Sequence, residues 1–197
     1  MINKSITTPL HQTLISSNRL ARMNWREKGV GISRIIFGLA WAVAAVLKWQ
    51  PQFQQSFVDQ ISAANAGQPA PIMGWISFWT QLISLNPLLF ARIEATTESV
   101  IAVFLIFGIM SNLTNIIGLF VSLGIWSVAE GFGGPLIPGQ STDIGTAFPY
   151  AILFAVLLFL SAGRYYGIDQ WLTPRLGRLG FLASGSIKRN RKNSERP

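Results

Sequence analysis

A long stretch without charged residues lies between Asp143 and Arg164 and reads IGTAFPYAILFAVLLFLSAG. A helix over this stretch, rising about 1.5 Å per residue, has roughly the length of the hydrocarbon core of a bilayer. The composition of the whole chain agrees, because 50% of its 197 residues are hydrophobic, only 12% are charged and the mean hydropathy is +0.39. This balance is too apolar for an ordinary soluble domain, and it predicts an integral membrane protein.

Three further apolar segments complete a predicted all-α membrane protein, a four-transmembrane-helix bundle. The expected spans are residues 29–49, 93–110, 113–129 and 144–164. The linker between the second and third spans, SNLTN, is short, so these two helices are expected to pack antiparallel. No internal repeat is evident.

The segment of residues 50–90, between the first two spans, is expected to lie on the outer face of the membrane. Its second half is long enough to span, but it is rich in polar residues, and a fifth span would place the two basic ends of the chain on opposite sides. We therefore predict an amphipathic helix that is interfacial or re-entrant. Its apolar side is expected to carry residues at helical spacing, namely Trp75, Phe78, Trp79 and Leu82.

Basic residues concentrate at the two ends of the chain, before residue 35 and after residue 174. Basic residues favour the cytoplasmic side, so both termini are predicted to be cytoplasmic and the protein is predicted to cross the cell (plasma) membrane several times. The expected organisation is a basic tail over 1–28, a membrane domain over 29–172 and a second basic tail over 173–197. No basic stripe is interleaved with aromatic residues, so the expected partner is the lipid bilayer and not nucleic acid.

The chain contains no cysteine and one histidine, His11, which lies in the polar N-terminal segment. The absence of cysteine excludes disulfides, thiolate metal sites and iron–sulfur clusters carried by this chain. A haem held by two histidines is excluded as well. We expect no metal or haem on this chain and find no redox group of its own.

Glu98 is the most informative charged residue, because a carboxylate inside a membrane span usually has a partner or a task. Glu94 and Glu98 share one helix face at i and i+4, where two carboxylates repel unless a cation or a shared proton intervenes. Lys48 ends the first span at the same predicted depth, so we expect a buried Lys48–Glu98 pair with a catalytic role. The alternative is that Glu98 only locks helix packing through a hydrogen bond.

Other polar and aromatic residues suggest weaker sites. Asp143 precedes the fourth span and is expected to cap it; if it does not, that helix N-terminus is free to hold an anion. Arg34 and Asp169 are expected to form a structural clasp at the cytoplasmic end, where Arg164 also lies. Trp41 and Trp126 are candidates for lining a quinone-sized pocket, the alternative being ordinary core packing.

The sequence resembles the DoxX/DoxD family of small four-helix membrane proteins. The resemblance rests on SRIIFGLAWAVAAVLKW in the first span, on NPLLFARIEATTESVIAVFLIFG, and above all on GGPLIPGQSTDIGTAFPYAILFAVLLFLSAGRYYGIDQWL. It covers residues 33–172 and depends on the order and spacing of these segments, since no single motif is highly specific. Within the family, the chain is most similar to the DoxD-type membrane subunit of thiosulfate:quinone oxidoreductase.

This resemblance implies that thiosulfate is oxidised to tetrathionate on the outer face and that membrane quinone accepts the electrons. It also implies a separate DoxA-type small subunit, while a homo-oligomer is left open. Lys48, Arg92 and the region of Asp143 are candidates for attracting the thiosulfate dianion, and Glu98 is the best-placed carboxylate to relay protons to quinone. Two alternatives remain: a non-catalytic DoxX-like anchor or assembly factor of a redox complex, and a small-solute transporter, for which the expected inverted repeat is missing.

Overall fold

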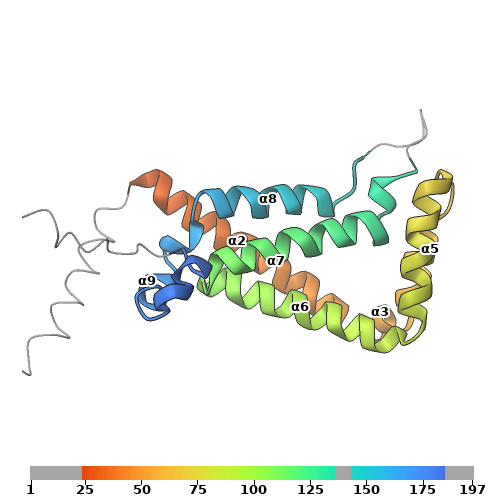
Figure 1. Ribbon diagram of the computed structural model, residues 1–197, viewed down its shortest axis with the longest axis horizontal. Coiled ribbons are helices and arrows are strands. Elements are labelled where there is room, and N and C mark those ends of the chain that lie inside the picture. Colours follow the sequence, from red (N-terminus) through yellow and green to blue (C-terminus); the bar gives the residue numbers. More distant parts are fainter. Residues whose placement is uncertain (1–23, 136–142, 185–197) are drawn as a thin grey trace, which may run out of the picture.

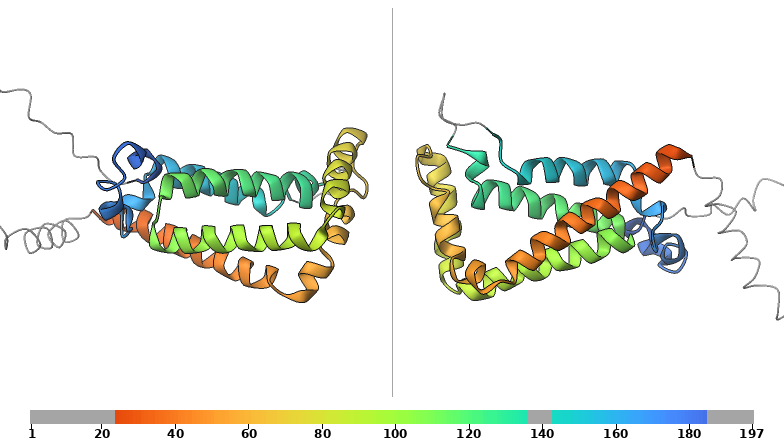
Figure 2. Two further views of the ribbon diagram at one scale, coloured as in Figure 1. Left: turned by 60° about the horizontal axis from the view of Figure 1, so that its bottom comes forward. Right: turned by 180° about the vertical axis from the view of Figure 1, so that it is seen from behind.

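The computed structural model describes residues 24–135 and 143–184, and every regular element in these ranges is a helix. Four long helices form the body of the molecule: α2 (Trp25–Lys48), α6 (Pro87–Phe107), α7 (Ser111–Gly124) and α8 (Ala147–Phe159). α2 packs along α6, and α7 packs along α8, so the body consists of two antiparallel pairs (Figures 1 and 2). The all-helical class predicted from the sequence is confirmed for the described residues.

Local sequence signals set the ends of these helices. Glu27 accepts a hydrogen bond from the backbone N–H of Asn24, at the start of α2 (3.0 Å). The Asn86 side chain accepts one from the N–H of Leu89, and Pro87 occupies the first turn of α6, where no backbone donor is needed. α6 ends at Gly108, whose φ of 62° is the left-handed conformation that glycine adopts without strain.

In the described part of the chain, two helices are long and apolar enough to cross a membrane, Trp25–Lys48 and the continuous helix Ser111–Ala129. The latter is α7 together with a wider helical turn, Ile125–Ala129. α6 is long enough but carries Arg92, Glu94 and Glu98, and α8 is apolar but shorter than the predicted span of 144–164. The two apolar helices are consistent with membrane association.

The segment after α2 folds into α3 (Pro51–Gln55), α4 (Phe57–Ala63) and α5 (Ala70–Ser84). Figure 1 shows α5 lying across one end of the body, opposite to the end where the described chain begins and finishes; we call these the α5 end and the α9 end. A small core under α5 joins it to the body through Phe57, Ile61, Ile76, Ile83, Ala91 and Val128.

The residues predicted for the apolar side of α5 contact the protein only in part, through Trp79, which packs against the small core. Ile76 and Ile83 are buried, whereas Trp75 and Phe78 are exposed and Trp79 and Leu82 are half-buried. Helical spacing identified apolar residues correctly but did not reveal which of two apolar faces meets the body, because that depends on the distant residues of the small core.

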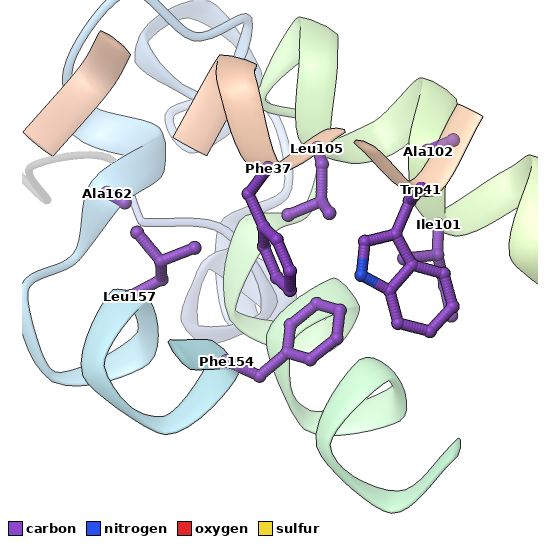
Figure 3. Close-up of a cluster of buried hydrophobic side chains, with 8 residues drawn as sticks. All are labelled: Phe37, Trp41, Ile101, Ala102, Leu105, Phe154, Leu157 and Ala162. Atoms are coloured by element: carbon purple, nitrogen blue, oxygen red, sulfur yellow. The ribbon is translucent and has the colours of Figure 1, made fainter. Parts of the chain in front are cut away.

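The main core lies between the two helix pairs and is rich in aromatic side chains. Phe37 and Trp41 of α2 contact Phe154 of α8, with ring centroids 4.8 and 5.3 Å apart, respectively (Figure 3). Ile101, Ala102 and Leu105 of α6 complete this cluster with Leu157 and Ala162. Edge-to-face aromatic contacts of this kind hold the pairs together.

The chain after α8 folds back over the α9 end as three short helices, Ala162–Arg164, α9 (Asp169–Leu172) and Gly177–Leu182. Backbone N–H groups of Ile168 and Asp169 donate to the carbonyls of Phe107 and Gly108, at the end of α6 (2.9 and 3.0 Å). These bonds satisfy carbonyls that a helix end leaves without partners.

Candidate functional site

The ion pairs found among the described residues lie where α2 ends beside α6. Lys48 is the last residue of α2, and the antiparallel packing of the two helices places it against Glu94 and Glu98. Its Nζ lies 3.0 Å from Glu98 Oε1 and also donates a hydrogen bond to Glu94 Oε1. The expected ion pair between Lys48 and Glu98 is therefore present, and Lys48 is the cation that allows the two carboxylates to share a helix face.

Burial differs within this cluster. The Glu98 side chain is 3% exposed, whereas those of Lys48 and Glu94 are 18% and 20% exposed. The ring of Phe53 lies with its centroid 5.0 Å from Lys48 Nζ, so a cation–π contact covers another side of the ammonium group. Glu98 is thus the innermost member, and Glu94 and Lys48 separate it from the surface.

Within residues 24–135 and 143–184, one oxygen of Glu98 has no hydrogen-bond partner. Oε1 faces Lys48, whereas Oε2 is buried and makes no hydrogen bond in these ranges. A buried carboxylate oxygen without a partner is costly, so this oxygen is a candidate acceptor for a proton or a hydrogen-bond donor. With both carboxylates ionised the cluster carries a net charge of −1, which favours contact with a proton or a hydrogen-bond donor over contact with an anion.

Arg92, a candidate for thiosulfate binding, lies on α6 near this cluster but is not part of it. Its side chain is exposed, and it forms no ion pair with Glu94 or Glu98. Lys48 is already engaged by two carboxylates, so Arg92 is the more available cation of the two.

The prediction that Asp143 caps the fourth span is wrong. Asp143 is exposed, and among the described residues its carboxylate accepts a hydrogen bond from the neighbouring N–H of Ile144 alone (2.6 Å), whereas α8 begins at Ala147. Glu130 takes the capping role from a distant position in the sequence: it accepts hydrogen bonds from the N–H of Ala147 (3.0 and 3.2 Å) and from the hydroxyl of Thr146. The α8 N-terminus is therefore occupied by a carboxylate and is not free to hold an anion.

The expected clasp between Arg34 and Asp169 does not form as an ion pair within the described ranges. Both side chains are fully buried at the α9 end, but each binds backbone groups instead. Arg34 donates to the carbonyls of Leu105, Ile106, Tyr165 and Tyr166, and thereby ties the end of α6 to the turn after α8. Asp169 accepts from the N–H groups of Ser111 and Ser184 (2.9 and 3.0 Å). Arg164, the third structural charge predicted there, is exposed.

The two candidate pocket tryptophans belong to different aromatic groups. Trp41 lies in the main core, 3% exposed, and its indole N–H has no hydrogen-bond partner among the residues that the structure describes. Trp126 lies near the α5 end, where its indole N–H donates to the Ile144 carbonyl (2.7 Å) and its ring contacts Phe132 and Phe148.

Within residues 24–135 and 143–184, no group of three or more His, Cys, Asp or Glu side chains is arranged to hold a metal ion. His11 lies outside the described residues, as do Ser141 and Thr142, which precede Asp143. Sequence reasoning missed the capping role of Glu130; the available signal was a carboxylate just before the glycine-rich loop that precedes the fourth span.

Comparison with protein-family models, curated proteins and solved structures gave no match for this chain. The resemblance to the DoxX/DoxD family therefore rests on the quoted segments alone.

Proposed function

We propose that this chain is the membrane subunit of a thiosulfate:quinone oxidoreductase, which passes electrons from thiosulfate to the quinone pool. In the proposed arrangement α2, α6, α7 with its extension, and α8 cross the cell membrane, both termini are cytoplasmic and the α5 end is outside. The two apolar helices, the basic ends of the chain and the buried charges of α6 support this arrangement.

The observation that carries the proposal is the free oxygen of Glu98. Reduction of a quinone to a quinol takes up two electrons and two protons, and oxidation of two thiosulfate ions to one tetrathionate supplies the two electrons. Glu98 is a buried carboxylate whose Oε2 has no hydrogen-bond partner among the described residues, and it is linked to the surface through Lys48 and Glu94. In this proposal Glu98 takes up a proton from the surface by way of Glu94, donates it to a quinone oxygen and is protonated again for the second proton, while Lys48 holds the side chain in place.

Thiosulfate binding is assigned to the outside of the α5 end, shared with a DoxA-type small subunit. The carboxylates at this end would repel an anion. However, Glu94 and Glu98 are paired with Lys48, and Glu130 accepts hydrogen bonds from the start of α8. Arg92 is exposed and unpaired with either of the α6 carboxylates, so it is the basic side chain of this chain that we assign to the dianion. The chain has no cysteine, so electron transfer is expected to need the partner subunit.

The packing of the main core favours a second candidate, a non-catalytic anchor or assembly factor of a redox complex. Trp41, Phe37 and Phe154 contact one another closely, and the Cβ of an alanine at Gly118 would lie only 2.2 Å from the Phe154 ring. The interior between the helix pairs is therefore filled by side chains at this level, as in a structural bundle.

The test is thiosulfate-dependent reduction of a soluble quinone analogue by the purified full-length protein, alone and together with the proteins that co-purify with it. The enzyme proposal predicts reduction in at least the second preparation. Absence of reduction in both preparations contradicts the enzyme proposal and leaves the anchor.

A further inference from the structure

The segment of residues 164–184 is fixed firmly to the α9 end of the body. Asp169 is fully buried, and its Oδ2 accepts hydrogen bonds from Ser111 at the start of α7 and from Ser184 at the end of the segment. The hydroxyl of Thr173 donates to the Asp169 carbonyl (2.7 Å). One buried carboxylate thus fastens both the middle and the end of the segment to the bundle.

Asn112 provides a second point of attachment. Its side-chain amide donates to the carbonyls of Phe181 (2.9 Å) and Ala183 (3.3 Å), and its oxygen accepts from the hydroxyl of Ser184 (2.7 Å). The segment is therefore an ordered cap, and the side chains that it exposes are held in place.

This cap exposes large apolar side chains. Trp171 is 61% exposed, Leu179 53% and Phe181 64%, although the backbone beside Phe181 is hydrogen-bonded to Asn112. Bulky apolar groups on an ordered surface next to membrane spans are typical of contact with the interfacial layer of a bilayer, where tryptophan is enriched.

The exposed charge of the cap is entirely positive. The charged residues of 164–184 are Arg164, Asp169, Arg175 and Arg178; the three arginines are exposed, and the only acidic residue is buried. A surface that combines exposed arginines with apolar side chains matches an anionic phospholipid, because guanidinium groups bind phosphate and the apolar groups reach the acyl boundary.

We propose that Trp171, Arg175, Arg178, Leu179 and Phe181 form a binding surface for anionic phospholipid on the inner leaflet. Arg175 and Arg178 bind the lipid phosphate, while Trp171, Leu179 and Phe181 enter the boundary between headgroups and acyl chains. This inference rests on the proposed orientation, in which the α9 end is cytoplasmic, but not on thiosulfate or quinone chemistry.

The depth of residue 181 in the bilayer tests whether the apolar side chains of the surface enter the membrane. The chain has no cysteine, so a Phe181→Cys variant carries a single spin label in the full-length protein. In vesicles of phosphatidylcholine with phosphatidylglycerol, the label is expected to collide more often with oxygen, which partitions into lipid, than with a water-soluble nickel chelate. The reverse ratio, in protein that remains in the membrane after alkaline extraction, overturns the proposal without affecting the assignment of membrane spans.

Variants of Arg175 and Arg178 test whether the surface binds anionic lipid headgroups. Native mass spectrometry of the full-length protein, released from the same vesicles, is expected to show preferential retention of phosphatidylglycerol over phosphatidylcholine. The double variant Arg175→Gln/Arg178→Gln should lower this preference by roughly fivefold for each arginine removed. Asp59→Asn, which alters an exposed charge on α4 at the opposite end, should leave the preference unchanged. Equal retention by the wild type and the double variant overturns the proposal and assigns these arginines to another anion, such as an acidic protein.

Discussion

Lys48 Nζ lies 3.0 Å from Glu98 Oε1, and this contact joins the last residue of α2 to the middle of α6. Glu94, one turn away on α6, binds the same ammonium group. A single lysine therefore neutralises part of the charge of two carboxylates that would otherwise repel each other across one helix turn. The cluster has both a structural and a proposed chemical role, and different variants separate the two.

Removal of the lysine should destabilise the protein. Lys48→Met leaves Glu94 and Glu98 without their cation, and breaking a mostly buried ion pair costs on the order of 3 kcal/mol. The expected result is a lower unfolding midpoint in detergent. The double variant Lys48→Met/Glu98→Gln should recover part of this loss, because the innermost carboxylate is then neutral; strictly additive losses would show that the two residues do not interact.

Replacement of Glu130 should loosen the start of α8. Glu130→Ala removes the acceptor for the Ala147 N–H and the Thr146 hydroxyl, and loss of a helix cap costs about 1 to 2 kcal/mol. Asp143→Asn is the matched control, because Asp143 accepts a hydrogen bond from its own neighbour, Ile144, and from no group of the α8 start. Chemical denaturation gives the free energy of unfolding of both variants. A larger loss of stability for Asp143→Asn than for Glu130→Ala would contradict the assignment of the cap to Glu130.

A lysine cannot replace Arg34. The guanidinium group of Arg34 donates to four carbonyls from two separate segments of the chain. A lysine side chain is shorter and ends in a single ammonium group, so it cannot bind both segments. Arg34→Lys is expected to lower the free energy of unfolding by roughly 3 kcal/mol, since hydrogen bonds from charged donors are among the stronger ones. The same exchange at the exposed Arg164 should change the unfolding midpoint little, and equal effects at both positions would refute the distinction.

The close approach of α7 and α8 depends on Gly118. A Cβ at this position would lie 2.2 Å from the ring of Phe154, whereas a Cβ at Gly124 meets nothing within 4 Å. Gly118→Ala is therefore expected to cost roughly 1 to 3 kcal/mol through overpacking, and Gly124→Ala to be neutral or slightly stabilising. Thermal unfolding of the two variants is the measurement, and similar midpoints would argue against tight packing of Phe154 on Gly118.

The sequence was sufficient to predict features that follow from the helical spacing of apolar residues and from the depth of charged residues within the predicted spans. Helical spacing and apolar content predicted long helices, and matched depth at the ends of two spans predicted the contact of Lys48 with Glu98. Both rest on local pattern or on simple antiparallel geometry, which a sequence carries directly. The membrane crossing of all four helices stays a prediction.

Features that depend on contacts between distant segments were not predicted. Glu130 caps a helix that begins at Ala147, and the sequence offered the nearer Asp143 as an equally suitable carboxylate. Arg34 and Asp169 were correctly placed at one end, but opposite charge suggested a direct pair, whereas unsatisfied backbone groups at helix ends bind both side chains instead. Competition between partners of this kind is decided by tertiary geometry and not by residue type.

The most direct test of the proposed function is the turnover of Glu98→Gln in thiosulfate-dependent quinone reduction, measured in the preparation that contains the co-purifying proteins. Glutamine keeps the size of the side chain and an acceptor for Lys48 but cannot donate a carboxylic proton. Turnover should fall by on the order of 100-fold while unfolding and assembly remain as in the wild type, and Asp59→Asn, which alters an exposed carboxylate on α4, should retain full turnover. Undiminished turnover in Glu98→Gln would contradict the proposed proton-donating role of Glu98.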